Sequence, residues 1–442
     1  MIWFVLVANA LASTGSGLGL TPLGGGFAGI TEPGALGITA NPAAAKSESI
    51  EVVLDAGANS FVLGAQLDGS DMEREEFRDT VPMPYLGFTA PIGDVGIGFY
   101  AMVPYGGGIE LAPDSAQRYH AISSKSYLIE VGVPIAYDAT DWLNLGASIR
   151  VGRASLSKTA AMNTAALINS KVELDPPLPT DNELLTGSQE VSIVGYGIGF
   201  GLGASFTLPN DLEVHLGYRS PLKAKMAGPV NLTPSDGIDL QLSGEAQGSM
   251  QFATEVELGV VIPISRTRLA LQAGWVDWSP LAVIDIGVRD LEIQSDDAAL
   301  TSLLATTGID ESDLLAAGTD IRNNLGHTSV FHGGATLGIP FGDKWEVRPG
   351  AFYSPTTLPD DGFHIGIADF MSWDLRLAGS YQLTQWLTTG LSFDQFLVKT
   401  RTIRTSGLAL DNDAASGRVL PSANGRYDMT ARRIGLSLIA RM

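Results

Sequence analysis

Four arginines stand out because each lies on the polar side of a stretch in which apolar and polar residues alternate. They are Arg150, Arg219, Arg348 and Arg376. A guanidinium group offers a planar pair of donors to a carboxylate, so these residues suit the head group of an otherwise apolar acid. The alternating stretches also carry acidic residues, namely Glu213, Glu346, Asp374 and Asp394. The sequence leaves open whether the arginines bind a ligand or are neutralised by these carboxylates.

Side chains suited to catalysis or metal binding form no recognisable motif. The five histidines are His120, His215, His327, His332 and His364, and none lies in a His-Glu-x-x-His pattern. No Gly-x-Ser-x-Gly sequence marks a nucleophilic serine. The chain has no cysteine, which excludes thiol catalysis and disulfides. We therefore expect a protein that is not an enzyme and that uses no cofactor or metal.

The charge balance is strongly acidic. The chain has 27 Lys and Arg against 48 Asp and Glu, a formal net charge of −21. Binding nucleic acid requires a basic surface that neutralises phosphates, so nucleic acid is not an expected partner.

A further distinctive stretch is Val103-Pro104-Tyr105-Gly106-Gly107-Gly108. Proline lacks the N–H that a strand donates to its neighbour, and glycine permits bulges. A strand with this composition cannot pair along its whole length and would leave an opening in the sheet. The alternative is an ordinary strand end that leads into a loop.

β-Strands must position these residues, because the dominant hydrophobic period is two. Leu143, Leu145 and Ile149 share one face of a segment whose other face carries Asn144 and Arg150. The same alternation recurs in residues 212–219, 373–381, 387–394 and 433–441. Many strands with one aliphatic face and one polar or glycine face are typical of a transmembrane β-barrel.

The connections between these strands are alternately short and long. Short turns are predicted near residues 91–94, 138–141, 208–211, 263–267, 340–343 and 383–385. Long polar segments are predicted near residues 68–80, 106–125, 158–189, 223–245, 287–325, 355–365 and 402–424. This pattern predicts an all-β, antiparallel transmembrane barrel of about fourteen strands over residues 48–442. An even strand number places both termini on the short-turn side, which is periplasmic in a bacterial outer-membrane barrel.

Two further features support this layout. Trp142, Trp345 and Trp386 each directly follow a short turn, where indole rings would form an interfacial girdle. Capping residues followed by Leu and Ala predict short helices within the outer loops, at residues 296–305, 310–317 and 160–168.

The beginning of the chain does not fit a barrel wall. Residues 1–12 are apolar with Ala-x-Ala steps, which predicts a signal peptide. Residues 13–47 are rich in Gly, Ala and Pro and carry almost no charge. Such a segment is too irregular for a spanning strand, so we expect a plug, or hatch, folded inside the lumen. A disordered leader is the alternative.

One strand of the predicted wall carries glycine at every second position. Gly195, Gly197, Gly199, Gly201 and Gly203 share one face, and the other face carries Tyr196, Ile198, Phe200 and Leu202. The aromatic face belongs in lipid, so the lumenal face is bare backbone. Glycine within a strand often marks a close backbone approach. Either the hatch packs on this face or a ligand passes along it.

Short motifs along most of the chain resemble the FadL/TodX family of outer-membrane transporters for long-chain fatty acids and hydrocarbons. In order they are Ser16-Gly17-Leu18-Gly19, Gly24-Gly25-Gly26-Phe27-Ala28-Gly29-Ile30, Asn41-Pro42-Ala43, Val103-Pro104-Tyr105-Gly106, Asp141-Trp142-Leu143-Asn144-Leu145-Gly146, Tyr218-Arg219-Ser220-Pro221, Trp278-Ser279 and Tyr353-Ser354-Pro355. The resemblance implies a fourteen-stranded barrel, a hatch that includes Gly24, Asn41 and Pro42, and a hydrophobic substrate. It also implies that the substrate leaves sideways through a kinked third strand at Pro104–Gly108.

The resemblance adds one site residue and suggests a function. Arg153 matches a basic position of the family, although its parity points away from the lumen. We therefore expect a monomeric, passive transporter in the bacterial outer membrane, surrounded by lipid and lipopolysaccharide. Its expected substrates are long-chain fatty acids, with aromatic hydrocarbons or alkanes as alternatives. A surface adhesin or phage receptor, and an open porin for polar solutes, are the competing classes.

Overall fold

The computed structural model describes residues 29–442, except for residues 69–73, 116, 120, 164–185, 234–240, 282, 295–319, 325, 364, 366–368 and 407–422. The predicted signal peptide, Gly24 and the predicted helices at residues 296–305 and 310–317 therefore lie outside the described residues. Among the described residues, no helix has the length and apolar character needed to cross a membrane.

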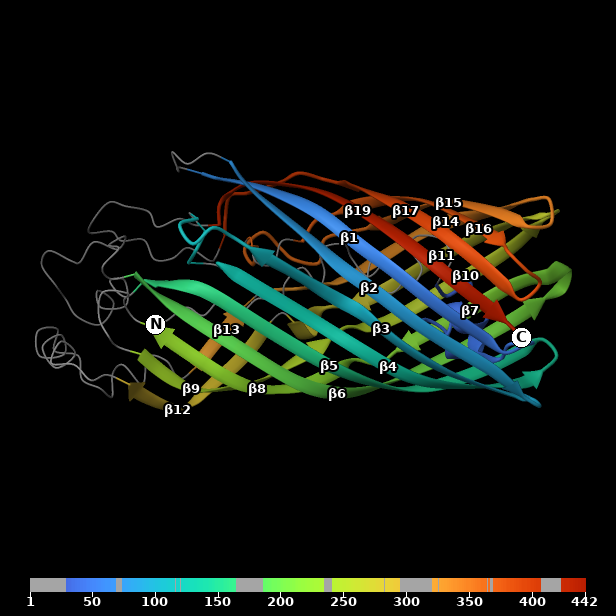
Figure 1. The fold of residues 1–442 in the computed structure, drawn as a ribbon, viewed down its shortest axis with the longest axis horizontal. Helices are drawn as coiled ribbons and strands as arrows, with labels where there is room; N and C mark the ends of the chain where they lie inside the picture. Colours follow the sequence, from blue (N-terminus) through green and yellow to red (C-terminus); the bar gives the residue numbers. More distant parts are fainter. Residues whose placement is uncertain are drawn as a thin grey trace, which may run out of the picture.

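The described residues form nineteen strand segments, which belong to one antiparallel sheet (Figure 1). They also form a few short 3-10 helices. The strands are β1 (Glu51–Leu67), β2 (Glu75–Ile92), β3 (Val95–Glu110), β4 (Ser123–Thr140), β5 (Leu143–Asn163), β6 (Thr186–Leu208), β7 (Leu212–Arg219), β8 (Leu222–Thr233), β9 (Gln241–Phe252), β10 (Thr254–Ile264), β11 (Thr267–Asp277), β12 (Val283–Gln294), β13 (Asp320–Asn324), β14 (Ser329–Phe341), β15 (Trp345–Ser354), β16 (Ser372–Gln382), β17 (Leu387–Val398), β18 (Arg401–Ile403) and β19 (Gly425–Arg441). The 3-10 helices are η1 (Gly34–Leu36), η2 (Pro42–Ala45), η4 (Pro209–Asp211) and η5 (Ser279–Leu281).

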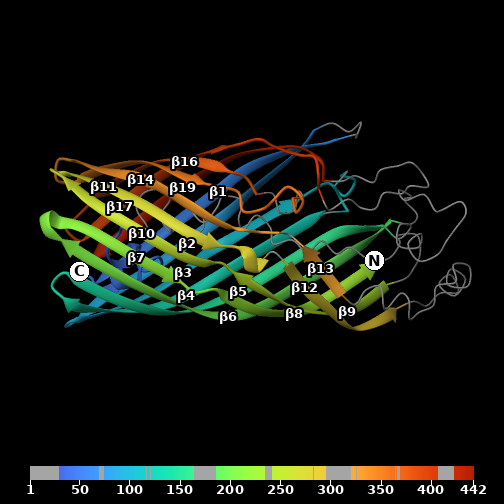
Figure 2. The ribbon, with the colours of Figure 1, turned by 180° about the vertical axis from the view of Figure 1, so that it is seen from behind.

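These segments make a closed barrel of fourteen strands, because five of the strands are broken into two pieces. β7 and β8 both pair with β6, and β17 and β18 both pair with β19. The other broken strands are β9 with β10, β11 with β12, and β13 with β14. The first and last strands, β1 and β19, pair from Glu51↔Arg441 to Leu67↔Gly425 and close the wall (Figures 1 and 2). The predicted strand number is confirmed.

The predicted two-residue period is confirmed by burial. On β5, Ile149 is 66% exposed, whereas its neighbour Arg150 is 3% exposed. On β6, Ile198 is 72% exposed and the glycines between the aromatic residues face inward. The outer surface is thus an apolar band, and the inner surface carries the polar and charged side chains. Without this alternation, a barrel could not satisfy lipid and a polar lumen at once.

The short turns lie where the sequence predicted them. They join β2 to β3, β4 to β5, β6 to β7, β10 to β11, β14 to β15 and β16 to β17, all at the barrel end where the C-terminus lies (Figure 1). Trp142, Trp345 and Trp386 are exposed on the outer surface beside these turns. The predicted helix at residues 160–168 is wrong for its described part, because β5 continues to Asn163 by pairing with Thr186.

The described part of the predicted hatch, residues 29–47, lies inside the barrel; we call it the hatch segment. η1 contacts β1, β2 and β3, and η2 contacts β4, β5 and β6, so the segment touches a large part of the wall. The Asn41 side chain accepts a hydrogen bond from Ala43 N at 3.0 Å and caps η2, and Pro42 occupies its first position. Ile30, Ala35 and Ile38 are fully buried.

Candidate functional site

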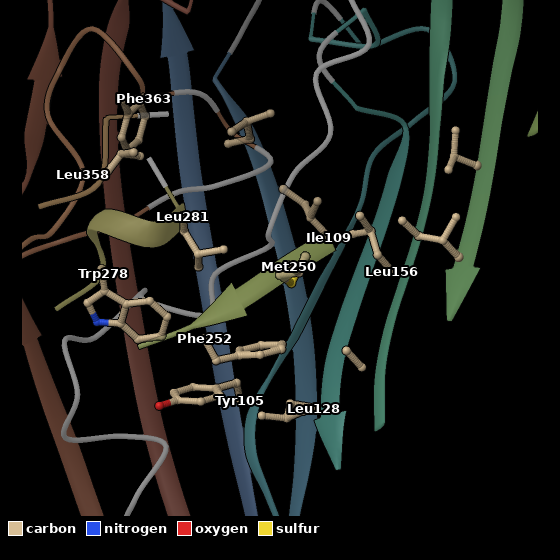
Figure 3. Close-up of a cluster of buried hydrophobic side chains, with 14 of the residues drawn as sticks. Tyr105, Ile109, Leu128, Leu156, Met250, Phe252, Trp278, Leu281, Leu358 and Phe363 are labelled. Atoms are coloured by element: carbon tan, nitrogen blue, oxygen red, sulfur yellow. The ribbon is translucent and has the colours of Figure 1, made fainter. Parts of the chain in front are cut away.

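A large cluster of buried apolar side chains lies inside the barrel, on the long-loop side of the hatch segment; we call it the lumenal apolar cluster. Figure 3 shows its centre, where Tyr105 from β3 meets Phe252 and Trp278 from the opposite wall. The Tyr105 and Phe252 rings stack with centroids 5.6 Å apart, and Tyr105 meets Trp278 edge-on at 5.3 Å. Inside a barrel whose inner wall is otherwise polar, such a cluster suits an apolar ligand.

Broken strands bring these aromatic residues into the lumen. Ser220 and Pro221 separate β7 from β8, Ala253 separates β9 from β10, and η5 interrupts the wall between β11 and β12. Three neighbouring strands are therefore interrupted side by side. Phe252 and Trp278 lie directly at two of these breaks, where the wall bends and their side chains are fully enclosed.

The connection between β15 and β16 also contributes to the cluster. Leu358, Phe363 and Phe370 from this segment, which we call the inner loop, are almost completely buried in the lumenal apolar cluster. The Asp369 carboxylate holds the loop by accepting hydrogen bonds from Leu358 N at 3.0 Å and from the Thr357 hydroxyl at 3.0 Å.

The environment of Asp369 has an electrostatic cost. Burial raises the pKa of the Asp369 carboxyl to about 6, although the donors from Thr356, Thr357 and Leu358 act to lower it. Arg401 supports the same loop by donating to Leu358 O at 2.6 Å and to Asp360 Oδ1 at 2.7 Å.

A buried lysine at the edge of the lumenal apolar cluster has no partner among the described residues. Lys158 on β5 is 4% exposed, and its Nζ makes no hydrogen bond or ion pair. Its strand neighbours are Ser124 on β4 and Val191 on β6, and Leu156 precedes it on the same face. The side-chain oxygens of Ser124, Ser126 and Gln189 are also buried without partners.

Ser124, Ser126, Lys158 and Gln189 form the Lys158 group, since the register places them on adjacent strands of one inner face. Buried polar atoms are normally hydrogen-bonded, and an unpaired buried cation is costly. A carboxylate head group would accept from Lys158 Nζ and from the Ser124 and Ser126 hydroxyls, whereas Gln189 Oε1 is itself an acceptor and requires a donor. Sequence analysis missed Lys158, although its parity with the apolar Leu156 marks it as a charge on a buried face.

The predicted arginines Arg150 and Arg219 are instead paired with carboxylates. Arg150 Nη1 lies 3.0 Å from Glu130 Oε2, and Arg219 Nη2 lies 2.9 Å from Glu130 Oε1. Arg219 Nε lies 3.2 Å from Glu255, and its Nη1 donates to the carbonyl of Thr39 in the hatch segment at 2.7 Å. Arg219 therefore binds the hatch segment to the wall, and Arg150 shares the Glu130 carboxylate with it.

The two tyrosines of β3, Tyr100 and Tyr105, join the same network. Tyr100 donates to Glu130 at 2.8 Å, and Tyr105 donates to Glu255. Tyr105 thus has its ring in the lumenal apolar cluster and its hydroxyl in the network that holds Thr39. This gives a continuous contact path from β3 to the hatch segment.

The other predicted basic residues are also accounted for. Arg348 Nη1 lies 3.1 Å from Glu32 of the hatch segment and its Nε lies 2.8 Å from Glu346, while Arg376 pairs with Asp374. Arg153 is exposed on the outer surface, as its parity indicates, and is not among the lumenal side chains.

The glycine face of β6 contacts three different neighbours. A Cβ on Gly203 would lie 2.0 Å from Asn41 Oδ1, and one on Gly201 would lie 3.3 Å from Pro42. Gly195 and Gly197 instead adjoin the backbone of β8, and Gly199 adjoins Arg150. The hatch segment therefore contacts this face at Gly201 and Gly203, the end nearest the short turn between β6 and β7. Further hatch contacts come from glycines that the sequence analysis did not single out: Gly87, Gly96, Gly146, Gly217 and Gly259.

The stretch at Pro104 interrupts the barrel wall. The ladder between β2 and β3 ends at Tyr85↔Met102, although both strands continue toward the long-loop end. The β3–β4 register shifts between Met102 and Tyr105, around Val103 and Pro104. Pro82 and Pro84 on β2 also lack an N–H, a signal that the sequence analysis missed.

This unpaired stretch spans β2 and β3 between their last ladder pair and the long loops. A Cβ on Gly108 would lie 3.3 Å from Asp79 Oδ2 on β2, so the two strands remain close there without a ladder. The stretch without a ladder thus coincides with the position of Tyr105 in the lumenal apolar cluster, and an opening for a ligand at this place stays a prediction. Within the described ranges, no group of three or more His, Cys, Asp and Glu side chains is arranged to hold a metal.

Comparisons with known proteins agree with this geometry. Residues 30–438 match the family described as outer membrane protein transport protein (OMPP1/FadL/TodX). No curated protein sequence matches the chain significantly. A Pseudomonas aeruginosa FadL homologue is similar in structure, with a TM-score of 0.77, 17% identity and coverage of 98% of this chain and 99% of the other.

Two further similar structures are those of toluene transporters. The P. putida toluene transporter TodX has a TM-score of 0.68 and 14% identity, and covers 98% of this chain and 99% of its own. The Ralstonia pickettii toluene transporter TbuX has a TM-score of 0.65 and 16% identity, with the same coverage of 98% and 99%. At these identities the likeness establishes the fold alone.

Proposed function

Because the chain belongs to the outer-membrane transport family that includes FadL and TodX, we propose that it carries long-chain fatty acids passively across the outer membrane. The family accounts for an outer-membrane transporter of hydrophobic molecules rather than an enzyme. The finer substrate assignment is supported by one observation. Lys158 is a buried amine without a described partner, beside an apolar cluster that would accept an acyl chain.

In the proposed route, a fatty acid enters from the long-loop end and places its carboxylate at the Lys158 group. Its acyl chain packs against the lumenal apolar cluster, including Phe252 and Trp278. Movement of the hatch segment and of β3 then opens the way sideways between β2 and β3, where the ladder is absent. Pro104 and the glycines Gly106, Gly107 and Gly108 give β3 the freedom to move.

The proposal also includes the setting of the barrel. The short turns and both termini lie in the periplasm, and the protein acts as a monomer because its closed wall leaves no sheet edge to cover. A surface adhesin or phage receptor would not need a segment inside the lumen. An open porin is disfavoured for the same reason, since residues 29–47 contact β1 through β6 within it.

Aromatic hydrocarbons and alkanes are the second candidate substrates. The ring pairs of Tyr105 with Phe252 and Trp278 favour flat apolar ligands, and two of the similar structures are toluene transporters. A neutral hydrocarbon would, however, leave the buried Lys158 without a partner among the residues that the structure describes. The charge of the ligand therefore separates the two proposals.

The test is to compare uptake of labelled oleate and of its neutral methyl ester in cells that lack their own transporter. Replacing Lys158 by Met removes the cation but keeps most of the volume. We expect oleate uptake to fall roughly tenfold, because one charge-assisted contact is worth about that much, and ester uptake to persist. Lys125→Met, an exposed lysine on β4, is the matched control. An unchanged ratio of oleate to ester in Lys158→Met would contradict the assignment.

A second experiment tests the sideways route. The chain has no cysteine, so a disulfide between Asp79→Cys and Gly108→Cys would be the only one. These positions face each other across the unpaired stretch of β2 and β3. We expect oxidation to block uptake and a reductant to restore it. Full uptake through the cross-linked barrel would rule out release between these strands.

A further inference from the structure

Three exposed cations lie together on the outer surface of the barrel. The register places Arg153 on β5 beside Tyr196 on β6, and Tyr196 beside Lys225 on β8. Lys223 lies two residues further along β8 on the same face. Neighbouring strands are about 4.8 Å apart, so these side chains can converge on one group above Tyr196. We call these four residues the external basic patch.

The external basic patch is not neutralised by any of the residues that the structure describes. None of its three cations takes part in an ion pair with a described residue, although the chain carries a net charge of −21. Other exposed cations near the long-loop end do have acidic partners. Arg78 lies 3.6 Å from Glu76, and Lys125 lies 3.6 Å from Glu110. An acidic protein thus presents a local positive charge to an external anion.

The height of the patch on the barrel indicates where that anion lies. Trp142 marks the edge of the apolar band at the short-turn end, and the outward residues Leu145, Ile149 and Val151 follow along β5. At ~3.3 Å per residue and a strand tilt of ~40°, Arg153 lies roughly 28 Å above Trp142. This distance corresponds to the far edge of an apolar band about 25 Å tall.

The surface below the patch is apolar. Ile198 and Phe200 are exposed directly beneath Tyr196 on β6, and Ile149 is exposed on the adjacent strand. Tyr196 itself is 64% exposed, and tyrosine favours the level of lipid head groups. Cations above an apolar surface match a molecule that has phosphates above several acyl chains.

We propose that the external basic patch binds lipopolysaccharide of the outer leaflet through the phosphates of its lipid A. The planar guanidinium of Arg153 would donate hydrogen bonds to a phosphate, and the ammonium groups of Lys223 and Lys225 would attract it by their charge. The acyl chains would lie against Ile149, Ile198 and Phe200. The proposal requires the short turns to be periplasmic, and it does not depend on which substrate the lumen carries.

The experiment measures lipopolysaccharide that stays bound when the full-length protein is extracted from outer membranes with mild detergent. Native mass spectrometry would count bound lipid for the unaltered protein and for the triple variant Arg153→Ser, Lys223→Ser, Lys225→Ser. We expect retention to fall at least tenfold, because charge-assisted contacts to phosphate are lost. The control is Arg78→Ser, Lys125→Ser, Arg432→Ser, which removes three exposed cations elsewhere and should retain the lipid.

A second measurement separates lipopolysaccharide from other phosphate-bearing lipids. Lipid A, dephosphorylated lipid A and phosphatidylglycerol would be offered to the delipidated protein in turn. We expect lipid A to bind and the other two to bind at least tenfold more weakly. Retention by the triple variant, equal loss in the control variant, or equal binding of phosphatidylglycerol would each overturn the proposal. The heat-dependent gel mobility of each variant verifies that its barrel has folded.

Discussion

Glu130 beside the hatch segment and Lys158 beside the lumenal apolar cluster are both buried charges, and they differ in their partners. Around the hatch segment, Glu130 receives Arg150, Arg219 and Tyr100 at hydrogen-bonding distance. Around the lumenal apolar cluster, Lys158 has no partner in the described part of the chain. A buried charge that is paired with opposite charges stabilises the structure, whereas a buried charge without such a partner is available to bind a ligand. The difference separates anchoring residues from ligand-binding residues, which residue type alone does not.

The largest expected effect on stability comes from breaking the ion pairs of Glu130 beside the hatch segment. Glu130→Gln keeps the shape of the side chain but leaves Arg150 and Arg219 buried without their shared carboxylate. Removing one partner of a buried ion pair typically costs about 3–5 kcal/mol. We expect the midpoint of urea-induced unfolding in lipid vesicles to fall clearly.

Lys158→Met is the counterpart of this variant beside the lumenal apolar cluster. It replaces an unpaired buried cation by an apolar side chain, so the same unfolding measurement should show an unchanged or higher midpoint. If Lys158→Met lost as much stability as Glu130→Gln, the two buried charges would both stabilise the fold, and the proposed difference between them would be wrong.

An intermediate effect is expected where the hatch segment meets the wall. A Cβ on Gly146 would lie 2.3 Å from Ala43 N, so Gly146→Ala must displace the hatch segment. Such overpacking typically costs about 1–3 kcal/mol. We expect higher conductance in planar bilayers as the lumen becomes less obstructed.

Gly379→Ala is the matched control, because the nearest atom to its added Cβ would be 3.9 Å away. Conductance of this variant should equal that of the unaltered protein. If Gly146→Ala also left the conductance unchanged, the hatch segment would not be what limits flow through the lumen.

The smallest effect concerns the inner loop and its dependence on pH. The pKa of Asp369 in the folded protein is about 6, above its usual 3.8. The folded loop therefore binds a proton more tightly than the unfolded loop does. Its added stability is fully present below about pH 4 and is lost as the pH rises through about 6.

Limited proteolysis of the inner loop in the folded barrel would measure this dependence. We expect slower cleavage at pH 4.5 than at pH 7 with an acid-tolerant protease calibrated on a peptide substrate. In Asp369→Asn the difference should disappear. A pH dependence that persists in Asp369→Asn would have to arise from another group.

The barrel was predictable because one rule governs every strand. Lipid outside and a polar lumen inside impose a period of two, so the parity of Arg150, Arg219 and Arg348 could be inferred without a structure. The helix predicted at residues 160–168 failed in its described part, because local preference was overridden by the ladder that β6 offers to the end of β5. Parity gives the face of a residue but not its height or its partners.

The candidate site was less predictable for that reason. Pairing within one strand, as between Arg376 and Asp374, lay among the alternatives that the sequence offered. Glu255 meets Arg219 because the two residues face each other in the β7–β10 ladder, and Glu130 reaches it from β4, which is not paired with β7. Lys158 was identifiable in principle, since Leu156 on the same face marks a position where a charge is out of place.

The Glu51 side chain links the hatch segment to the strand that closes the barrel. One of its carboxylate oxygens accepts from Ala35 N in the hatch segment at 2.8 Å, and the other lies 2.9 Å from Arg441 Nη2 on the last strand. Glu51 can reach both partners only when β19 has paired with β1. Docking of the hatch segment and sealing of the β1–β19 seam therefore share one carboxylate, and each step favours the other.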